Sequence, residues 1–423
     1  MLLLASCSFN KNSGFWSGAK TIKKENVINT TEIFKEKKAY EKEINPNLKI
    51  QLSLKPKSNN FINNLNNSGH VDYNGELKKT SRFKYSKIKD FHQYEPDLIF
   101  DKNNIIFFDD KGSILKFNNY SELIWKKNYY SKKEKKKKPF LFFAKNSNIL
   151  IVADTISKYY AIDISTGNLL WSKFNSVPFN SEIKLYKDRF FVVDFENIIR
   201  CYSIKDGKQI WKFKTEKAII KSQKKLSIII IKDTVYFSNS IGDITAIKAK
   251  NGDLIWQTPT QKSAIIAGHF LSKTSDLVSD NNSIFFSNNN NEFFSLDSKA
   301  GIINWKQNIN STLRPTLINN LIFTISNEGF LVVIDKNTGS ILKMTNVFDI
   351  FRKKKRSRIK PEGFIIGNKK IYLTTNNGRL LIIDISSGKT SNVLKIDGDR
   401  ISKPFILGKS MFIIKNNAII KLN

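Results

Sequence analysis

The sequence predicts an all-β fold, an eight-bladed β-propeller built from four-stranded antiparallel blades. Three observations lead to this prediction. A Gly-x-x-x-Trp pattern returns every forty to fifty residues, short β-rich runs joined by polar turns precede each copy, and the chain ends three expected strands after the last copy. A repeat of about this length with a Gly and a Trp is typical of propeller blades, which must stack to bury both faces.

The repeat is clearest where one strand enters a polar turn and the next strand leaves it toward a tryptophan. Two copies read DISTGNLLW (163–171) and DSKAGIINW (297–305), two later copies keep Asp335 or Asp384 but lose the Trp, and Ser121 stands where the first copy should have Gly. We expect the glycines to supply the positive φ of the turn, the aspartates to cap its backbone, and the tryptophans to pack between blades. The repeat glycines are Gly167, Gly207, Gly252, Gly301, Gly339 and Gly388, and the repeat tryptophans are Trp125, Trp171, Trp211, Trp256 and Trp305.

Each repeat should form a meander of four strands. TVYFSNSIGDITAI (234–247) and KIYLTTNNGRLLII (370–383) each contain two strands around a hairpin turn, because Gly-Asp and Asn-Gly accept the backbone angles of tight turns. The run that ends at the Trp is the outer strand. A further strand should precede the hairpin, as in VPFNS (177–181) and STLRPTLI (311–318).

The number of blades follows from the outer strands. These end at positions 125, 171, 211, 256, 305, 343 and 392, which makes seven blades. Residues 403–423 hold three more strands, and TSRFKYSKI (80–88), which precedes the first strand of the first blade (97–101), can supply the fourth. We therefore expect an eighth blade that is closed by an N-terminal strand. Seven blades followed by an unrelated tail is the alternative.

The formal net charge of +33 would ordinarily indicate nucleic acid or an anionic surface. Lys, Asn, Ile and Phe are frequent everywhere, however, so the excess reflects a bias of the whole chain. The densest runs, Lys132–Lys138 and Arg352–Arg358, fall in expected loops and lack the interleaved aromatic residues that stack on bases. We expect solvated loops and no nucleic acid, with an attraction to acidic lipid or an acidic partner as the alternative.

The N-terminal residues MLLLASC end in Leu-Ala-Ser-Cys, which resembles a bacterial lipobox with Cys7 as the lipid-modified residue. The apolar stretch is too short to span a bilayer, and no basic residues precede it. We expect residues 1–7 to be a truncated lipoprotein signal, residues 8–78 a mostly flexible tether, and residues 79–423 the propeller. Cys201, the other cysteine, lacks a disulfide partner and should be a buried thiol.

Catalysis finds little support in the sequence. Propellers with this repeat include quinone-dependent dehydrogenases, whose sites need a metal cage of carboxylate and amide oxygens and a catalytic carboxylate. Here His70, His92 and His269 are scattered, no adjacent Cys-Cys pair can clamp a quinone, and turn capping explains the recurring aspartates. Hydrolase, metalloprotease and nucleotide-binding motifs are missing as well. We expect no enzyme, no cofactor and no metal.

With its repeat, its lipobox and its lack of catalytic motifs, the chain resembles the outer-membrane protein assembly factor B family. The members of this family are eight-bladed propeller lipoproteins that share their repeat with quinoprotein dehydrogenases. The resemblance covers residues 78–423 and is most specific from Leu271 to Gly388. It implies a scaffold of the β-barrel assembly machinery, lipid-anchored through Cys7 to the periplasmic face of the cell outer membrane. Such a scaffold binds the POTRA domains of the barrel-forming subunit and aids the folding and insertion of outer-membrane proteins. A periplasmic quinone-dependent dehydrogenase or another ligand-binding propeller is the alternative.

The resemblance also implies where the partner binds. Relatives use two neighbouring loops that lead into consecutive central blades, a Leu-x-Leu-Arg loop and an acidic loop, which correspond here to about 216–224 and 268–276. The first loop lacks the arginine, and cationic or neutral residues stand where acids would be expected in the second. Ile219 and Ile220 could instead begin an inner strand and point into the core. The implied contact residues are Ile219, Ile220, Lys221, Leu271, Lys273 and Asp276.

Overall fold

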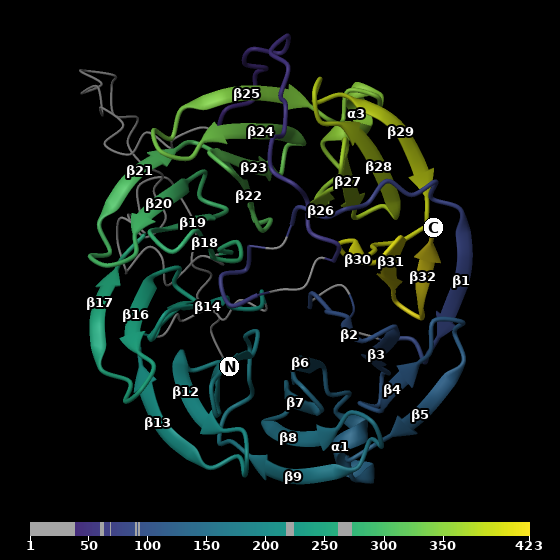
Figure 1. The fold of residues 1–423 in the computed structure, drawn as a ribbon, viewed down its shortest axis with the longest axis vertical. Coiled ribbons are helices and arrows are strands. Elements are labelled where there is room, and N and C mark those ends of the chain that lie inside the picture. The colour runs from purple at the N-terminus through teal and green to yellow at the C-terminus, as the bar shows by residue number, and fades with distance from the viewer. Residues whose placement is uncertain are drawn as a thin grey trace, which may run out of the picture. The chain divides into compact units, whose positions relative to one another are not determined.

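The computed structural model describes residues 39–59, 63–67, 69–88, 91, 94–216, 224–260 and 273–423. The chain divides into two units, Met1–Lys38 and Ala39–Asn423. In the second unit, the described residues form eight four-stranded antiparallel sheets that follow one another around a central axis (Figure 1). The predicted eight-bladed propeller is therefore confirmed, and the alternative of seven blades with an unrelated tail is wrong.

Seven blades are continuous meanders in which the first strand lies at the axis and the fourth at the rim. The first two consist of β2 (Ile99–Asp101), β3 (Asn104–Phe108), β4 (Ile114–Phe117) and β5 (Leu123–Lys127), then β6 (Leu141–Asn146), β7 (Ile149–Asp154), β8 (Lys158–Asp163) and β9 (Leu169–Phe174). The third and fourth consist of β10 (Lys184–Tyr186), β11 (Arg189–Val193), β12 (Ile198–Ser203) and β13 (Gln209–Lys214), then β14 (Ile228–Ile231), β15 (Thr234–Ser238), β16 (Ile244–Lys248) and β17 (Leu254–Thr258). The fifth to seventh consist of β18 (Val278–Ser279), β19 (Ser283–Ser287), β20 (Phe293–Asp297) and β21 (Ile303–Gln307), then β22 (Thr316–Ile318), β23 (Leu321–Ile325), β24 (Phe330–Asp335) and β25 (Ile341–Asn346), then β26 (Pro361–Ile366), β27 (Lys370–Thr375), β28 (Arg379–Asp384) and β29 (Thr390–Lys395).

The eighth blade joins the two ends of the propeller. Its three inner strands are β30 (Phe405–Leu407), β31 (Ser410–Lys415) and β32 (Ala418–Leu422), and its outer strand is β1 (Lys79–Lys84). β1 runs antiparallel to β32, with Arg82 opposite Ile420 and Phe83 opposite Ile419. Figure 1 shows the blue β1 beside the yellow β32. The ring is thus closed by hydrogen bonds between segments from opposite ends of the sequence.

The segments that cross from one blade to the next differ from the sequence prediction. VPFNS (177–181), predicted as the first strand of the third blade, makes only isolated bridges, and the innermost strand is β10. The reason is that the segment has no single neighbouring strand: the Phe179 N–H donates to the Asp154 carbonyl of the second blade, the Asn180 N–H donates to the Val193 carbonyl of β11, and Ser181 bridges to Leu226. Two basic runs predicted as loops contain short helices, α1 (Lys132–Lys136) and α3 (Lys353–Arg356).

The Gly turn of one blade lies against the outer strand of the preceding blade. Gly207 has a φ of 67°, and a Cβ added to it would lie 2.6 Å from the Trp171 ring. The Trp171 indole also donates a 3.0 Å hydrogen bond to the Ile204 carbonyl of that turn. Ser121, at the position of the missing glycine, has a φ of 69° and so adopts the same backbone conformation. Trp125, Trp211, Trp256 and Trp305 donate to carbonyls of the next blade in the same way.

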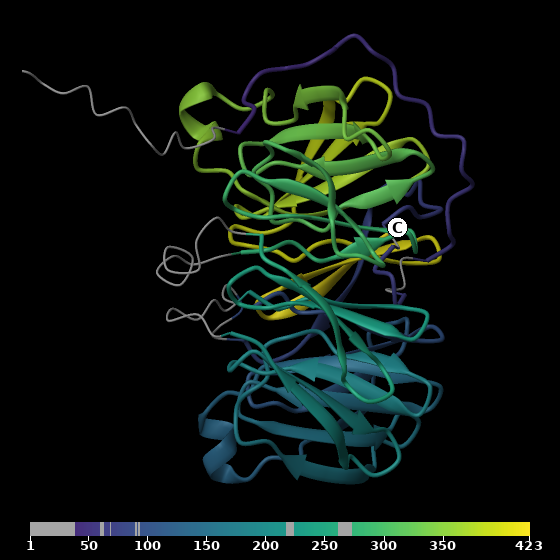
Figure 2. The same ribbon diagram turned by 90° about the vertical axis from the view of Figure 1, so that its left-hand side faces the viewer.

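Residues 48–59, 63–67 and 69–77 lie along the propeller on the face that carries the Gly turns, here called the turn face, whereas residues 40–43 lie beside the ends of β21 and β25 (Figure 2). Ile44 pairs with Met344, and the Val71 N–H donates to the Ile366 carbonyl of β26. Val71 and Tyr73 are fully or almost fully buried. Of the expected division of the chain, residues 1–7 and 8–38 lie outside the described residues. Among the described residues, no helix has the length and apolar character needed to cross a membrane.

Candidate functional site

Charged side chains gather at the central axis, where the chain crosses from an outer strand to the next inner strand. The charged groups come from seven of the eight blades, and we call them the axial cluster. Its members are Glu95 and Asp97 before β2, Glu182 and Lys184 at β10, Lys224 and Lys225 before β14, Asp276 before β18, Arg314 before β22, Glu362 in β26, and Arg400 and Lys403 before β30.

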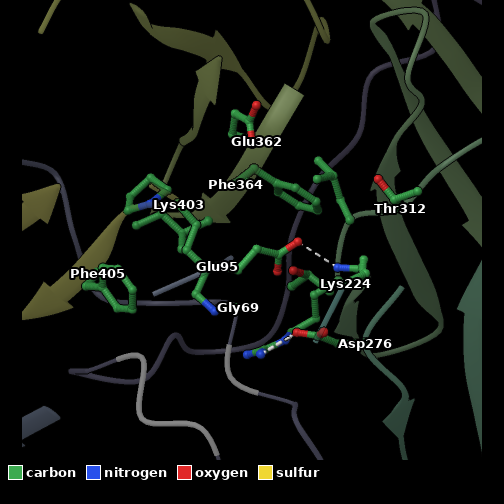
Figure 3. A pocket seen from close by; sticks show the side chains of 15 residues that line it. Gly69, Glu95, Lys224, Asp276, Thr312, Glu362, Phe364, Lys403 and Phe405 are labelled. Atoms are coloured by element: carbon green, nitrogen blue, oxygen red, sulfur yellow. Dashed lines mark hydrogen bonds and ion pairs between the residues drawn. The ribbon is translucent and has the colours of Figure 1, made fainter. Parts of the chain in front are cut away.

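The members of the axial cluster pair with one another, as Figure 3 shows for several of them. Lys224 reaches across the axis from the fourth blade to Glu95 before the first, with an N–O distance of 2.7 Å. Arg314 Nε donates to Asp276 at 2.7 Å. Four further pairs belong to the network: Lys403 with Asp97 at 2.7 Å, Lys225 with Asp97, Arg400 with Glu362 at 2.6 Å, and Lys184 with Glu182 at 3.3 Å. Apart from Glu182, which pairs with Lys184 of its own blade, these carboxylates face cations of other blades, so the pairs link inner strands around the axis.

Burial and pairing act against each other on the acids of the axial cluster. Burial alone would raise the pKa of Asp276, but Arg314 and nearby lysines hold that pKa well below its usual value. The same balance keeps the pKa of Asp97 low, beside Lys225 and Lys403. For Glu362 burial prevails over Arg400 and raises the pKa to about 7. Glu362 is thus the member of this group whose charge is expected to change near neutral pH.

One residue of the N-terminal segment enters the axis from the turn face. The Asn66 amide donates to Glu182 Oε1 at 3.0 Å and to the Leu277 carbonyl at 3.0 Å, while Lys184 donates to its side-chain oxygen. Asn66 is fully buried. The chain therefore fills part of its own central channel, and links blades three and five through one side chain.

Among the cavities that border the axial cluster, two differ greatly in size. The smaller, of about 50 Å³, lies beside Glu95, Lys224 and Lys403. The larger, of about 600 Å³, is lined by inner strands of the first, second, third and eighth blades, with apolar side chains such as Phe100 and Phe143. Its volume is in the range of small-molecule sites.

The described residues offer no obvious catalytic arrangement. No group of three or more His, Cys, Asp or Glu residues among them is placed to hold a metal ion. The recurring turn aspartates accept backbone hydrogen bonds, as when the Thr166 N–H donates to Asp163 at 2.8 Å. Cys201 lies fully buried in β12, where burial raises the pKa of its thiol to about 12. A thiol with such a pKa is a poor nucleophile at neutral pH.

Two of the residues implied as partner contacts lie in the described part of the chain. Lys273 is exposed on the face that carries the blade-to-blade crossovers, here called the crossover face, and its N–H donates to Asn289 Oδ1 at 2.8 Å. Asp276 is only 5% exposed and belongs to the axial cluster. Ile219, Ile220, Lys221 and Leu271 lie outside the described residues, as does the proposed lipidation site Cys7.

The axial cluster itself was missed in the sequence, where its charges were taken as part of the chain-wide bias. A usable signal existed, because a charged residue stands within a few positions of the start of most inner strands, where apolar residues would otherwise be expected. Lys225, Asp276 and Arg314 are examples in three consecutive blades. Which acid meets which cation depends on the closed ring and could not be derived from spacing.

Comparison with known proteins points to one family. The family model described as outer membrane protein assembly factor BamB matches residues 110–345, more than half of the chain. The protein of that name from Legionella pneumophila (strain Paris) is 23% identical over 161 residues, 37% of this chain and 37% of that protein. An uncharacterized protein of Rickettsia prowazekii (strain Madrid E) is 21% identical over 265 residues, 61% of this chain and 58% of that protein. The chain thus covers less than two thirds of the length of these curated relatives.

Solved structures share the fold at low identity. BamB from Moraxella catarrhalis matches with a TM-score of 0.65 and 12% identity, over 82% of this chain and 99% of that chain. A quinohemoprotein alcohol dehydrogenase, ADHIIG from Pseudomonas putida HK5, matches with a TM-score of 0.59 and 10% identity, over 82% of this chain and 76% of that chain. The family model, which spans more than half of the sequence, distinguishes between these neighbours: the chain belongs to the family of outer membrane protein assembly factor BamB.

Proposed function

We propose that this protein is a non-enzymatic scaffold of the β-barrel assembly machinery, located at the periplasmic face of the outer membrane and lipid-anchored through Cys7. In this proposal it binds the POTRA domains of the barrel-forming subunit and aids the folding and insertion of outer-membrane proteins. The observation that carries the proposal is the family match over residues 110–345. The paired charges of the axial cluster add support, because they are engaged with each other at the place where propellers often bind ligands.

The proposed partner site lies on the crossover face, in the loops that lead into the fourth and fifth blades. Lys273 is exposed there and makes no ion pair with a described residue. In the family such a position is acidic, so a cation here would suit a partner surface of opposite charge to the one that relatives bind. Asp276, which Arg314 holds inside the axis, would contribute indirectly by fixing the end of the loop.

The proposal is tested by capturing the barrel-forming subunit from detergent-solubilised envelopes with the tagged full-length chain. Lys273→Glu should weaken capture roughly tenfold at low salt and less at high salt, because an interface charge acts mainly on the association rate. Lys299→Glu is the matched control, since Lys299 is also exposed and belongs to the same blade but lies in a turn on the opposite face. Failure of the unmodified chain to capture any barrel-assembly subunit would contradict the proposal.

A second variant examines the apolar part of the proposed surface. Ile220→Asp combined with Leu271→Asp should abolish capture, because truncating or charging an apolar anchor commonly costs more than about 2 kcal/mol of binding. Circular dichroism of the same variant separates binding from folding. Retained fold with retained capture would place the interface elsewhere, and loss of the folded signal would support the alternative that Ile219 and Ile220 belong to the core.

The alternative is a quinone-dependent dehydrogenase or another ligand-binding propeller. The fold shared with the quinohemoprotein alcohol dehydrogenase and the cavity of about 600 Å³ favour it. Titration of the purified chain with pyrroloquinoline quinone and calcium, followed by calorimetry, decides between the two. Stoichiometric binding would favour the alternative, and the scaffold proposal expects none.

A further inference from the structure

Two strongly basic segments stand on the propeller apart from the proposed partner loops. Residues 132–138, which include α1, hold six lysines and one glutamate, and residues 349–360, which include α3, hold seven Lys or Arg and one aspartate. The first segment joins the outer strand β5 to the inner strand β6, and the second joins β25 to β26. Both are therefore crossovers between consecutive blades.

The two segments lie on the same face of the molecule. In a four-stranded meander every crossover leaves from the same end of the blade, while the Gly turns lie at the other end. Figure 2 shows α1 and α3 on the left-hand side, whereas most of the purple N-terminal segment runs along the right-hand side, over the turn face. Around the ring of eight blades, the two crossovers are separated by three blades on the shorter side. A partner that touches both must be broad and nearly flat.

Most cations of these segments have no acidic partner among the described residues. Lys132, Lys133 and Lys136 are exposed and form no ion pair there, and the same holds for Lys353, Lys354 and Lys355. The single acid of α1, Glu134, caps the helix and pairs with Lys158 at 3.2 Å. Each segment therefore presents an uncompensated group of positive charges to its surroundings.

An apolar side chain accompanies the second segment. Ile350 is 52% exposed, directly before the basic residues that lead into α3. The aromatic residues beside the two segments, Tyr130 and Phe351, are buried or half-buried and offer no free ring for stacking on bases. Cations around an exposed aliphatic side chain suit the interface of a bilayer, where headgroups are charged and the acyl region begins just below them.

We propose that the crossover face binds the surface of an anionic phospholipid membrane, with α1 and α3 as two separate points of contact and Ile350 reaching into the interface. Clusters of Lys and Arg at a membrane surface are attracted by the negative potential of acidic lipids. This binding site does not require the lipid anchor, and it uses none of the proposed partner-contact residues, although Lys273 lies on the same face. Its consequence is orientation: the axis of the propeller would stand upright on the membrane with the turn face pointing away.

The test is co-sedimentation of the purified full-length chain, carrying Cys7→Ser so that no anchor contributes, with vesicles of phosphatidylcholine that contain one third phosphatidylglycerol. The chain should bind these vesicles at low salt, bind pure phosphatidylcholine vesicles at least about 100-fold more weakly, and dissociate at about 0.5 M salt, where screening is strong. Neutralising one membrane-proximal lysine should lower the partition coefficient roughly fivefold. Lys353→Gln/Lys354→Gln/Lys355→Gln and Lys132→Gln/Lys133→Gln/Lys136→Gln should therefore each lose on the order of 100-fold.

The control removes the same charge from the turn face. Lys205, Lys250 and Lys299 are exposed in turns of the third, fourth and fifth blades, and their triple change to Gln should lose less than about fivefold, because these positions face away from the membrane. Ile350→Ser should weaken binding severalfold without changing its salt dependence. All the changed residues are exposed, so melting temperatures should be unaltered.

Three results would overturn the proposal. The first is equal loss in the control and the two crossover variants, since net charge would then explain the binding. The second is equal binding to neutral and acidic vesicles. The third is tighter binding of duplex oligonucleotide or polyglutamate than of acidic vesicles at the same ionic strength, lost in the same variants, which would assign the surface to a macromolecular polyanion. None of these results depends on whether the barrel-assembly subunit is captured.

Discussion

At the scale of single residues, the axial cluster shows how a charged centre can hold a ring together. Removing two charges from water costs several kcal/mol per ion, so such pairs add little to net stability compared with apolar packing. Breaking one pair is different, because the remaining charge stays buried without compensation. Asp276 and Arg314 come from neighbouring blades and are both largely buried. The contribution of this pair to the free energy of unfolding is therefore best measured by substituting each residue alone and then both together.

Arg314→Met should lower the free energy of unfolding by about 3–5 kcal/mol, because Asp276 remains buried without its partner. Asp276→Leu should have a similar cost, and the double variant should be closer to the wild type than the sum of the two. Urea denaturation of the wild type, the two single variants and the double variant gives the coupling free energy between the two side chains directly. The same set of single and double substitutions at the exposed pair Lys187 and Asp233 should show a far smaller coupling free energy. Strict additivity for Arg314 and Asp276 would refute the role assigned to the pair.

Glu362 should make stability depend on pH. Its pKa is raised from 4.5 to about 7 in the folded protein, so the folded state keeps a proton that the unfolded state releases between those values. The stabilising contribution is fully present below pH 4.5 and disappears as the pH rises through about 7, with a size of at most about 3 kcal/mol. Glu362→Gln should remove this dependence. If chemical denaturation from pH 4.5 to 8 gives parallel stability curves for both proteins, Glu362 does not titrate in this range.

At the scale of strands and crossovers, the local sequence predicted the hairpins of the blades well and the segments between blades poorly. The hairpins were predictable because Gly and Asn turns are flanked by β-branched and aromatic residues, as at 370–383. The first strand of the third blade was misplaced, since 177–181 has the composition of a strand while its N–H groups are divided between the second and the third blade. A crossover is shaped by contacts with distant residues, and these have no local signature. The helix at Lys132–Lys136 was also predicted as a loop, although Ser131 and Glu134 form a capping box, which is a local signature of a helix start.

The strand that closes the ring gives a prediction at this scale. Deleting residues 417–423 removes β32 and leaves β1 and β31 without their shared neighbour. Exposed strand edges of this kind pair with other molecules, so the shortened protein should aggregate and melt at a lower temperature. Deletion of residues 1–7, equal in length, serves as the control and should leave the melting temperature unchanged. A shortened protein that stays monomeric with the melting temperature of the full chain would contradict closure by β1 and β32.

At the scale of the whole molecule, the number of blades was predictable and the use of the faces was not. The repeat fixes the ring, because each Gly turn must fit the outer strand of the preceding blade, as Gly207 fits Trp171. This requirement leaves the crossovers free to vary, which is consistent with a TM-score of 0.65 at 12% identity to BamB from Moraxella catarrhalis. The charge of the crossover face became interpretable only when the fold brought α1 and α3 to one side.

The last prediction concerns how the molecule is held at the membrane. If Cys7 carries two or three acyl chains, attachment should be stable, whereas one chain alone would be marginal. Cys7→Ser should therefore move the protein from the membrane fraction to the soluble periplasmic fraction. The basic crossover face should leave a residual association that a high-salt wash removes, because screening at high ionic strength suppresses attraction to acidic lipid. Fractionation before and after such a wash separates the two contributions. A substituted protein that still sediments with membranes after the wash must have another anchor, and the assignment of Cys7 would then be wrong.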